Sequence, residues 1–287
     1  MVSPERVGVI GGGLMGSGIA EVFARSGSSV IVHEIDAGTA EAARSRIESS
    51  LAKAVERGKL DAASRDQTLA NIVVSIDLGD QADRQLVIEA ATENEGLKKQ
   101  VFADLDAVVA DREAILASNT SSIPITRLAS VTSRPDHVIG LHFFNPVPVM
   151  ALVELVTTVM TAPEVATRAK AHAEGLGKTV IESRDRAGFI VNMLLVPYLL
   201  GAIKMLEAGF ATREDIDAGM RLGANHPMGP LELADFVGLD TMKLIADVLF
   251  DEFKDPMYAS PPLLTRMVEA GLLGRKSGRG FYDYGGT

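Results

Sequence analysis

A glycine-rich turn between a short apolar strand and a helix constrains this chain more than any other feature. Residues 6–11 (RVGVIG) form a β-branched run, a helical spacing of apolar residues follows, and a second apolar strand begins soon afterwards. Strand, turn, helix and strand within about thirty residues is the size of a βαβ unit. The glycines at the junction form the pattern GxGxxG and are Gly11, Gly13 and Gly16. This context is typical of a dinucleotide-binding turn.

We expect this turn to bind the diphosphate of a dinucleotide at the positive end of the helix, together with the first helical residues, Leu14 and Met15. The first two glycines permit a tight turn and a close approach of the diphosphate, and the third lets helix and strand pack together. Glu34 ends the second strand and can accept hydrogen bonds from the adenosine ribose. Its charge would repel a 2′-phosphate, so the sequence favours NAD over NADP. Asp36 is an alternative for this role, or the N-terminal acid of the next helix.

Strand-like and helix-like segments alternate after Glu34. Strands are predicted at 71–76, 85–90, 114–119, 137–144, 152–156 and 179–182, and helices at 37–57, 97–109, 124–129 and 163–175. This alternation predicts an α/β fold of the Rossmann type, with a doubly wound, mostly parallel sheet. The composition then becomes helical, with helices predicted at 188–207, 212–222, 230–236, 239–253 and 261–270. We therefore expect two domains, 1–186 and 187–287, of which the second is all-α.

The segment HFFNPVPVMALVE places His142 twelve residues before Glu154. Its two prolines, Pro146 and Pro148, exclude a continuous helix between them. If the chain reverses near Pro148, the histidine and the acid lie equally far from the turn and could face each other across antiparallel strands. A histidine held by a carboxylate has the geometry of an oriented general base. The alternative is a buried histidine that is merely hydrogen bonded to a neighbour.

Polar residues follow several predicted strands, at the edge where ligands of such sheets bind. They are Glu93, Lys98, Ser118, Asn119, Thr120, Ser121 and Ser122. The alternative for SNTSS is a polar turn that caps the next helix. A basic group on the predicted helix 37–57 and just beyond comprises Arg44, Arg46, Lys53, Arg57 and Lys59. It is either a solvated face or, in an acidic protein, a site for a second, phosphorylated ligand.

Several classes of function are excluded or disfavoured. The formal net charge of −10 argues against a nucleic-acid partner. The chain has no cysteine, which excludes disulfides and thiolate catalysis, and neither HExxH nor GxSxG occurs, so we expect no metal site and no hydrolase. The apolar segment 189–206 is interrupted by polar residues and is short for a membrane span. Without a cationic leader at the N-terminus, the expectation is a soluble, cytoplasmic protein.

Taken together, the motifs resemble the L-3-hydroxyacyl-CoA dehydrogenases, and most closely their compact bacterial 3-hydroxybutyryl-CoA members. The motifs are VGVIGGGLMGSGIA, VIEAATEN, ASNTSS, GLHFFNPVPVMALVELV, GFIVNMLLVPYLL, HPMGPLELADFVGLD and LGRKSGRGFYDY. They span essentially the whole chain in the expected order. The resemblance implies reversible NAD-dependent oxidation of an L-3-hydroxyacyl-CoA to the 3-oxoacyl-CoA, and a homodimer formed through the C-terminal helices.

The resemblance also implies roles for individual residues. His142 would be the catalytic base and Glu154 its orienting partner, while Ser121 and Asn192 would hold the substrate oxygen. The positions near NAD would be the Gly11–Gly16 loop, Glu34, Glu93, Lys98, Ser121, Asn145 and Lys276. Ser50 and Arg57 match positions that contact coenzyme A, where the family usually has lysine instead of arginine. Both cations can bind phosphate, so this change is mild.

Three departures from the family pattern leave the preferred acyl-chain length open. They are Met193 in place of an arginine, Ala151 in place of a lysine and His226 in place of a tyrosine. Two other functions stay possible on the same scaffold. One is a dehydrogenase of a free 3-hydroxy acid or sugar acid, and the other is a non-catalytic NAD-binding structural protein.

Overall fold

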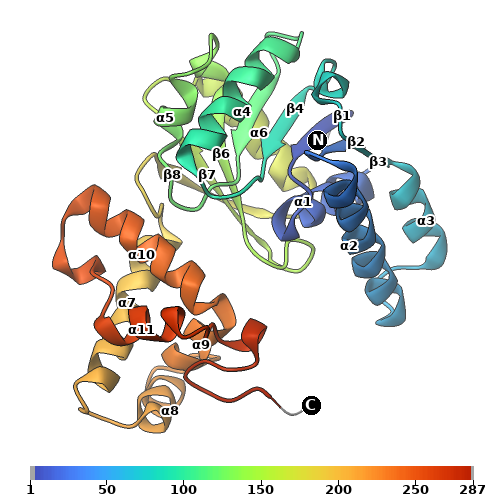
Figure 1. The fold of residues 1–287 in the computed structure, drawn as a ribbon. Coiled ribbons are helices and arrows are strands. Elements are labelled where there is room, and N and C mark those ends of the chain that lie inside the picture. Colours follow the sequence, from blue (N-terminus) through green and yellow to red (C-terminus); the bar gives the residue numbers. More distant parts are fainter. Residues whose placement is uncertain (1–3, 286–287) are drawn as a thin grey trace. The chain divides into compact units, whose positions relative to one another are not determined.

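The computed structural model describes residues 4–285, and the chain divides into two compact units (Figure 1). The first extends to Arg186 and the second begins at Ala187. Each unit has its own cluster of buried hydrophobic residues.

The first unit is built on one twisted sheet. Its strands are β1 (Arg6–Ile10), β2 (Ser29–His33), β3 (Ile72–Ser75), β4 (Leu86–Glu89), β5 (Ile115–Ser118), β6 (Val138–Phe143), β7 (Leu152–Thr157) and β8 (Thr179–Arg184). Their order is β3-β2-β1-β4-β5-β6-β7-β8, and only the β6–β7 pair is antiparallel. The order reverses direction between β1 and β4, which is the switch point where such sheets bind ligands. The predicted mostly parallel sheet is confirmed.

Helices cover both faces of this sheet (Figure 1). They are α1 (Leu14–Arg25), α2 (Ala37–Glu56), α3 (Ala62–Ala70), α4 (Glu95–Val108), α5 (Ile125–Ala129) and α6 (Pro163–Gly175), with 3-10 turns η1 (Leu78–Gln81) and η2 (Pro135–His137). Successive strand residues point to opposite faces. In β5 both Ile115 and Leu116 are buried, which requires cover on the two faces. The predicted doubly wound arrangement is therefore confirmed.

Within residues 4–186, helix α3 is the one regular helix that the sequence did not predict. Asp61 caps it by accepting a hydrogen bond from the Ser64 amide at 2.8 Å. Among its own residues only Thr68 is buried. A helix that buries one residue leaves no apolar stripe to detect in the sequence.

The connection between β6 and β7 is held against helix α1. A side chain at Gly18 would bring its Cβ within 2.9 Å of Val147, so the glycine permits this close packing. The ammonium of Lys178 donates to the carbonyls of Val147 and Met150 at 2.6 and 2.7 Å. Burial, with a smaller effect of Arg25, lowers the pKa of Lys178. The loop that joins β6 to β7 is thus tied to the helix that begins at the glycine turn.

The second unit is all-α, as predicted. Its helices are α7 (Val191–Glu207), α8 (Arg213–Gly223), α9 (Pro230–Val237), α10 (Leu239–Phe253) and α11 (Pro262–Glu269), with 3-10 turns η3 (Pro256–Tyr258) and η4 (Arg275–Ser277). Buried Asp235 accepts hydrogen bonds from the amides of Phe281 and Tyr282, both at 2.9 Å, and so fixes the C-terminal segment. Within residues 4–285, no helix has the length and apolar character needed to cross a membrane.

Candidate active site

The glycine turn has room for a ligand at one of its three glycines. Gly11 has φ +90°, and a Cβ on Gly16 would lie 1.8 Å from the Gly11 carbonyl oxygen, so the fold itself requires both. At Gly13, by contrast, a Cβ would meet no heavy atom within 4 Å. Gly13 is the N-cap of α1. Open space beside helix N-terminal amides suits an anionic diphosphate.

Glu34, and not Asp36, is the acid at this turn. One carboxylate oxygen of Glu34 accepts a hydrogen bond from the Gly12 amide at 2.6 Å. Asp36 instead caps α2 and accepts from the Thr39 amide at 2.8 Å, a bond that lowers the pKa of Asp36. The alternative that Asp36 is a helix N-terminal acid is therefore confirmed, and of these two acids Glu34 is the one hydrogen bonded to the glycine turn.

His142 and Glu154 form a buried pair. The antiparallel β6–β7 register places the two residues opposite each other, and His142 Nδ1 lies 2.6 Å from Glu154 Oε2. Only 7% of His142 and none of Glu154 is exposed. The predicted facing of these side chains is confirmed. An ionised carboxylate only accepts hydrogen bonds, so this contact favours the tautomer that carries its proton on Nδ1, in which Nε2 is the acceptor.

The loop that carries Ser121 is held on two sides. The Glu93 carboxylate accepts hydrogen bonds from the Ser121 amide and the Ser122 hydroxyl, both at 3.1 Å, and from the Thr120 hydroxyl. On the other side, the Asn119 side chain accepts from the Phe143 amide at 2.8 Å. Phe143 directly follows His142 in β6. The structure thus ties the Ser121 loop to the strand that carries the histidine.

Glu89 is a site residue that the sequence reasoning missed. Its carboxylate is fully buried, lies 2.6 Å from the Lys98 ammonium, and accepts a hydrogen bond from the Ser118 hydroxyl, also at 2.6 Å. The β4–β5 register pairs Glu89 with Ser118. The available signal was an acid inside the apolar segment QLVIEA, because a buried carboxylate needs partners.

Asp185 was missed as well. Its carboxylate accepts hydrogen bonds from the amides of Ile125 and Thr126, both at 2.7 Å. These amides open helix α5, which follows the Ser121 loop. Asp185 therefore fixes the downstream end of this loop from a position sixty residues away in sequence from Ile125.

Helix α2 presents the predicted basic residues. Arg46 donates to the Gly12 carbonyl at 3.1 Å, which places its guanidinium at the glycine turn. Arg57 is exposed and Ser50 is half-buried. Among residues 4–285, no ion pair involves Arg57 or Lys53. These cations are available to an anionic ligand.

Three further predicted site residues belong neither to the Ser121 loop nor to the His142–Glu154 pair. Asn145 is exposed in the β6–β7 connection. Asn192, the second residue of α7, and Lys276 belong to the second unit, where Asn192 is 9% exposed. The Lys276 ammonium lies 2.6 Å from an oxygen of Asp240. The roles assigned to these three residues stay predictions.

Two of the three residues that depart from the family pattern are hydrogen bonded to a neighbouring side chain. The Met193 sulfur accepts a hydrogen bond from the Tyr258 hydroxyl at 3.6 Å. His226 Nδ1 lies 3.1 Å from the Tyr198 hydroxyl. Ala151 is exposed just before β7. Each side chain is accommodated without disturbing the His142–Glu154 pair.

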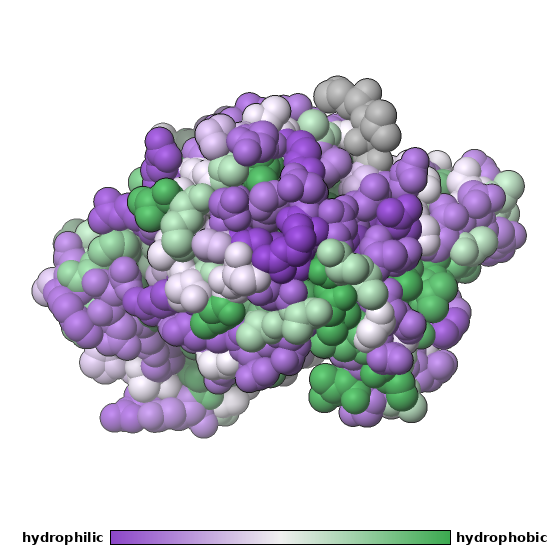
Figure 2. All heavy atoms as spheres, turned by 90° about the horizontal axis from the view of Figure 1, so that it is seen from above, coloured by the Kyte–Doolittle hydropathy of each residue, from purple (hydrophilic) through white to green (hydrophobic). Residues whose placement is uncertain are grey.

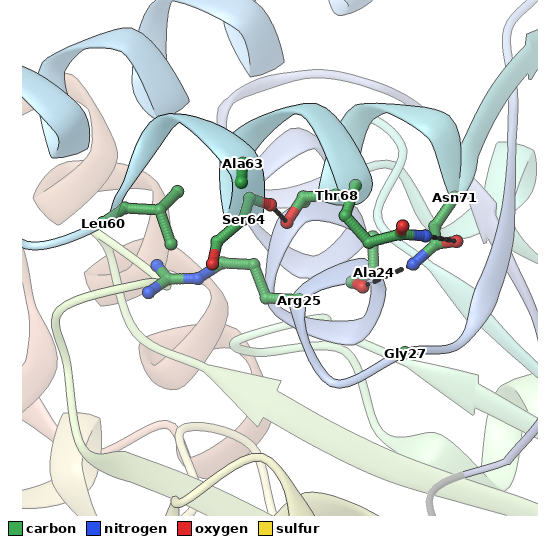
Figure 3. Close-up of a pocket in the computed structure, with 9 residues that line it drawn as sticks. Ala24, Arg25, Gly27, Leu60, Ala63, Ser64, Thr68 and Asn71 are labelled. Atoms are coloured by element: carbon green, nitrogen blue, oxygen red, sulfur yellow. Dashed lines mark hydrogen bonds between the residues drawn. The ribbon is translucent and has the colours of Figure 1, made fainter.

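A pocket of about 530 Å³ lies between the C-terminal end of α1 and helix α3 (Figure 3). Its lining includes Asn71, which directly precedes β3, so the pocket is at the amino edge of the sheet, opposite the ligand-binding edge. Two of its polar side chains are hydrogen bonded to other lining residues: Thr68 donates to the Ser64 carbonyl and Asn71 to the Ala24 carbonyl. We do not assign this pocket to the active site.

Comparison with known families decides the relationship. Residues 6–186 match the model of the 3-hydroxyacyl-CoA dehydrogenase NAD binding domain, and residues 188–284 match that of the 3-hydroxyacyl-CoA dehydrogenase C-terminal domain. The chain belongs to the 3-hydroxyacyl-CoA dehydrogenase family. It is 58% identical over 281 residues to the 3-hydroxybutyryl-CoA dehydrogenase of Mycobacterium tuberculosis, covering 98% of each chain. It is 43% identical to the human mitochondrial hydroxyacyl-coenzyme A dehydrogenase, over 98% of this chain and 91% of the relative.

Solved structures agree with this membership. The crystal structure of M. tuberculosis FadB2 superposes with a TM-score of 0.97 at 57% identity, covering 99% of this chain and 100% of the other. The (S)-3-hydroxybutyryl-CoA dehydrogenase PaaH1 of Ralstonia eutropha gives a TM-score of 0.93 at 45% identity, with the same coverage. In this 3-hydroxyacyl-CoA dehydrogenase the glycine turn, the Ser121 loop and the His142–Glu154 pair all belong to the first unit.

Proposed function

We propose that this chain catalyses the reversible NAD-dependent oxidation of an L-3-hydroxyacyl-CoA, with 3-hydroxybutyryl-CoA as the substrate, to the 3-oxoacyl-CoA. The observation that carries the proposal is the buried His142–Glu154 pair with its 2.6 Å contact, in the same unit as a glycine turn with space for a diphosphate. Family membership and the activities named for the relatives support it.

In the oxidation, Nε2 of His142 takes the proton of the substrate hydroxyl. Glu154 holds the proton on Nδ1 and stabilises the imidazolium that forms. NAD supplies the acceptor for the hydride that leaves C3. Positioned acid–base catalysis of this kind contributes on the order of 10²–10⁴ in rate. In the reverse direction the same nitrogen donates the proton to the new alcohol.

Ser121 and Asn192 hold the substrate oxygen in this proposal. The serine hydroxyl and the asparagine NH₂ are both donors, so they can stabilise negative charge on the oxygen as the ketone is reduced. The hydrogen bonds that Glu93 accepts from the Ser121 loop and Asp185 accepts from the start of α5 support a fixed position for this serine.

For the cofactor we propose NAD, bound at the glycine turn with Glu34 near the adenosine ribose. The Glu34 carboxylate would repel the extra phosphate of NADP. Residues proposed to lie near NAD are Gly11, Gly13, Leu14, Met15, Gly16, Glu93, Lys98, Ser121, Asn145 and Lys276.

For the coenzyme A part of the substrate we propose contacts with Ser50 and Arg57. These residues are seven apart on α2 and its C-cap, which is close to two helical turns, so they share one face. The exposed guanidinium of Arg57 can bind phosphate. In a chain of net charge −10, such a local cation is needed to attract a polyanionic substrate.

We also propose that the enzyme is cytoplasmic and that it forms a homodimer through its C-terminal helices. Leu194 and Met205 of α7 are 71% and 40% exposed, and a Cβ on Gly201 would meet nothing within 4 Å. These three positions recur at helical spacing and leave one apolar face of α7 open to a second helix. On the face of the molecule that Figure 2 shows, hydrophobic residues lie among mainly hydrophilic ones.

The test is to follow NADH consumption with acetoacetyl-CoA, with longer 3-oxoacyl-CoAs and with free acetoacetate, and to repeat it with NADPH. We expect turnover of the thioesters with NADH and much weaker turnover of free acetoacetate and with NADPH. Activity on free acetoacetate that equals or exceeds that on the thioester would favour a dehydrogenase of free acids. Cofactor binding without any turnover would favour a structural NAD-binding protein.

A further inference from the structure

We propose that Asn119 is a positioning residue that holds Ser121 and His142 at a fixed separation, because its side chain extends strand β5. This inference rests on the proposed function, in which Ser121 holds the substrate oxygen and His142 takes the proton. Both groups must then reach the same oxygen atom, so their separation matters for catalysis. Asn119 acts through the backbone of the Ser121 loop and of β6.

The strand of His142 continues past the end of its neighbour. The parallel β5–β6 register ends with Ser118 opposite Gly140, whereas β6 runs on to Phe143. On its other side, β6 stays paired with β7 up to Phe143 opposite Val153. The last three residues of β6, with His142 in the middle, therefore have a strand beside them on one side only. Backbone amides that point to the other side need a different acceptor.

Asn119 supplies this acceptor. It directly follows Ser118, and its Oδ1 accepts a hydrogen bond from the Phe143 amide at 2.8 Å. The partner atom must be the side-chain oxygen, because a backbone amide only donates. Both residues are enclosed, with 9% of Asn119 and 2% of Phe143 exposed. The asparagine side chain thus takes the place of the next strand carbonyl, and a buried amide would lose its partner without it.

The backbone between Asn119 and Ser121 is held at both ends. The Asn119 amide donates to the Glu89 carbonyl at 2.8 Å, which anchors this residue to β4. The Ser121 amide donates to the Glu93 carboxylate at 3.1 Å. A shift of Asn119 would therefore be passed on to Ser121, which follows two residues later.

The bond between Asn119 and Phe143 closes the path between the two proposed catalytic groups. Phe143 directly follows His142, and Asn119 is in the same short loop as Ser121. Without this bond, we expect the end of β6 to move relative to the Ser121 loop, so that the two groups no longer reach one oxygen atom. A displacement of about 1 Å in a catalytic group can cost on the order of 10²-fold in rate.

The first experiment is the Asn119→Leu variant, in which a side chain of similar shape offers no acceptor. We expect kcat with acetoacetyl-CoA to fall about 10²-fold. The Kd of NADH for the free enzyme, measured by fluorescence titration, should change less than about threefold, since the glycine turn is unchanged. A kcat close to wild type would overturn the inference. A rise of about tenfold or more in the Kd would also overturn it and assign Asn119 to the cofactor site.

The conservative variant Asn119→Asp keeps an acceptor oxygen but adds a charge. The preceding residue, Ser118, binds the Glu89 carboxylate through its hydroxyl, so a further negative charge should lower the melting temperature. We nevertheless expect this variant to keep most of the wild-type kcat, because the Phe143 amide retains its acceptor. A merely structural residue would make activity follow stability. An Asp variant as slow as Asn119→Leu would overturn the inference.

The second experiment introduces Asn119→Leu into a Ser121→Ala background. If Asn119 acts by placing the Ser121 hydroxyl relative to His142, the double variant should be hardly slower than the slower single variant. Effects of the two changes that multiply would overturn the inference. Should Asn119→Leu not fold, Asn119→Gln keeps the amide but moves its oxygen by one methylene group. It should lower kcat and leave the Kd of NADH unchanged, and an unchanged kcat in Asn119→Gln would count against the positioning role.

Gln85→Met is the matched control. The Gln85 Oε1 accepts hydrogen bonds from the amides of Glu5 and Arg6 at 3.0 and 3.1 Å, where β1 begins. It is a side-chain amide oxygen bonded to strand backbone, as in Asn119, but at the edge of the sheet opposite the proposed site. This variant should lower the melting temperature and leave kcat near the wild-type value.

The outcomes separate the two proposals. If the wild-type enzyme does not turn over the thioester, the proposed function fails. If the wild type is active and Asn119→Leu is as fast as Gln85→Met, only the positioning role of Asn119 fails.

Discussion

Glu154 lies directly opposite His142 in the β6–β7 ladder, and its Oε2 is 2.6 Å from Nδ1 of the histidine. The connection between the strands contains both prolines of the segment, Pro146 and Pro148. The pair is therefore set by backbone register as well as by the hydrogen bond. A side chain held in this way has little freedom to leave its catalytic orientation.

Replacing Glu154 with Gln should lower kcat on the order of 10²–10⁴-fold, because the amide can present its NH₂ to Nδ1 and favour the wrong tautomer. The Kd of NADH should stay within about threefold of wild type, since the cofactor turn is unchanged. Glu182→Gln is the control, because Glu182 pairs with Lys170 on the exposed side of β8. Near-normal kcat in Glu154→Gln would contradict the orienting role.

Replacing His142 with Gln should remove most turnover, by on the order of 10²–10⁴-fold, because the general base is lost. NADH should still bind, as fluorescence titration would show. His137→Gln serves as the control. This histidine lies in η2, and its Nδ1 is 3.1 Å from Oδ1 of Asp136. Turnover by His142→Gln close to that of His137→Gln would exclude His142 as the base.

Gly13→Ala and Gly16→Ala should behave differently. A Cβ at position 13 meets nothing within 4 Å, whereas one at position 16 would lie 1.8 Å from the Gly11 oxygen. Gly13→Ala should therefore keep nearly the wild-type melting temperature and raise the Kd of NADH about tenfold, since its methyl group enters the diphosphate space. Gly16→Ala should lower the melting temperature without any ligand. The opposite pattern would place the diphosphate elsewhere.

Arg57→Met should raise KM for acetoacetyl-CoA several-fold with little change in kcat, because a contact with a remote phosphate stabilises the ground and transition states equally. The control is acetoacetyl-pantetheine, which lacks the nucleotide phosphates, and its KM should be unaffected. A rise in KM for both substrates would indicate a structural role for the exposed Arg57.

Asp106 should contribute to acid stability. Burial alone would raise its pKa, but the hydroxyl and amide of Ser133 and the guanidinium of Arg134 together lower it to about 2 from 3.8. A carboxyl with a lowered folded pKa stabilises the protein above the unfolded pKa, and this stability is lost as the pH falls through the folded value. We expect about 1–2 kcal/mol, after allowance for solvent, to be lost between roughly pH 4 and pH 2.

Urea unfolding of wild type and Asp106→Asn over a series of pH values would measure this contribution. The free energy of unfolding should differ between the two proteins near pH 6, and the difference should shrink as the pH approaches 2. A difference that does not change with pH would show that Asp106 acts through its shape and not through its charge.

Much of the fold could be predicted because its signals are local. The three glycines of the turn and the acid at the end of β2 occur at fixed offsets, and alternating strands and helices predict a parallel sheet. Helix α3 could not be predicted from the sequence, because only one of its residues, Thr68, is buried. Its stability comes from the Asp61 cap and from contacts with α1 and α2, and these interactions leave no apolar periodicity in the sequence.

The candidate site was predicted in part. The His142–Glu154 pair could be predicted because the two prolines exclude a helix between the residues, and a reversal near Pro148 places both equally far from the turn. The network of Glu89 could not, because its members come from β4, α4 and β5 and meet only after the sheet has formed. A capping aspartate such as Asp185, sixty residues from the amide of Ile125, likewise leaves no local pattern.

The packing of Val147 against Gly18 has a consequence for how specificity can change. It joins the hairpin of the His142–Glu154 pair to the helix that starts at the glycine turn, so the proposed acid–base pair and the proposed cofactor turn belong to one unit. The helical unit that begins at Ala187 has its own hydrophobic core, so outside the proposed site residues Asn192 and Lys276 it can vary without altering this packing. Exchange of that unit between relatives should move acyl-chain preference from one enzyme to another, while the stereochemistry of hydride transfer stays with the donor of the first unit.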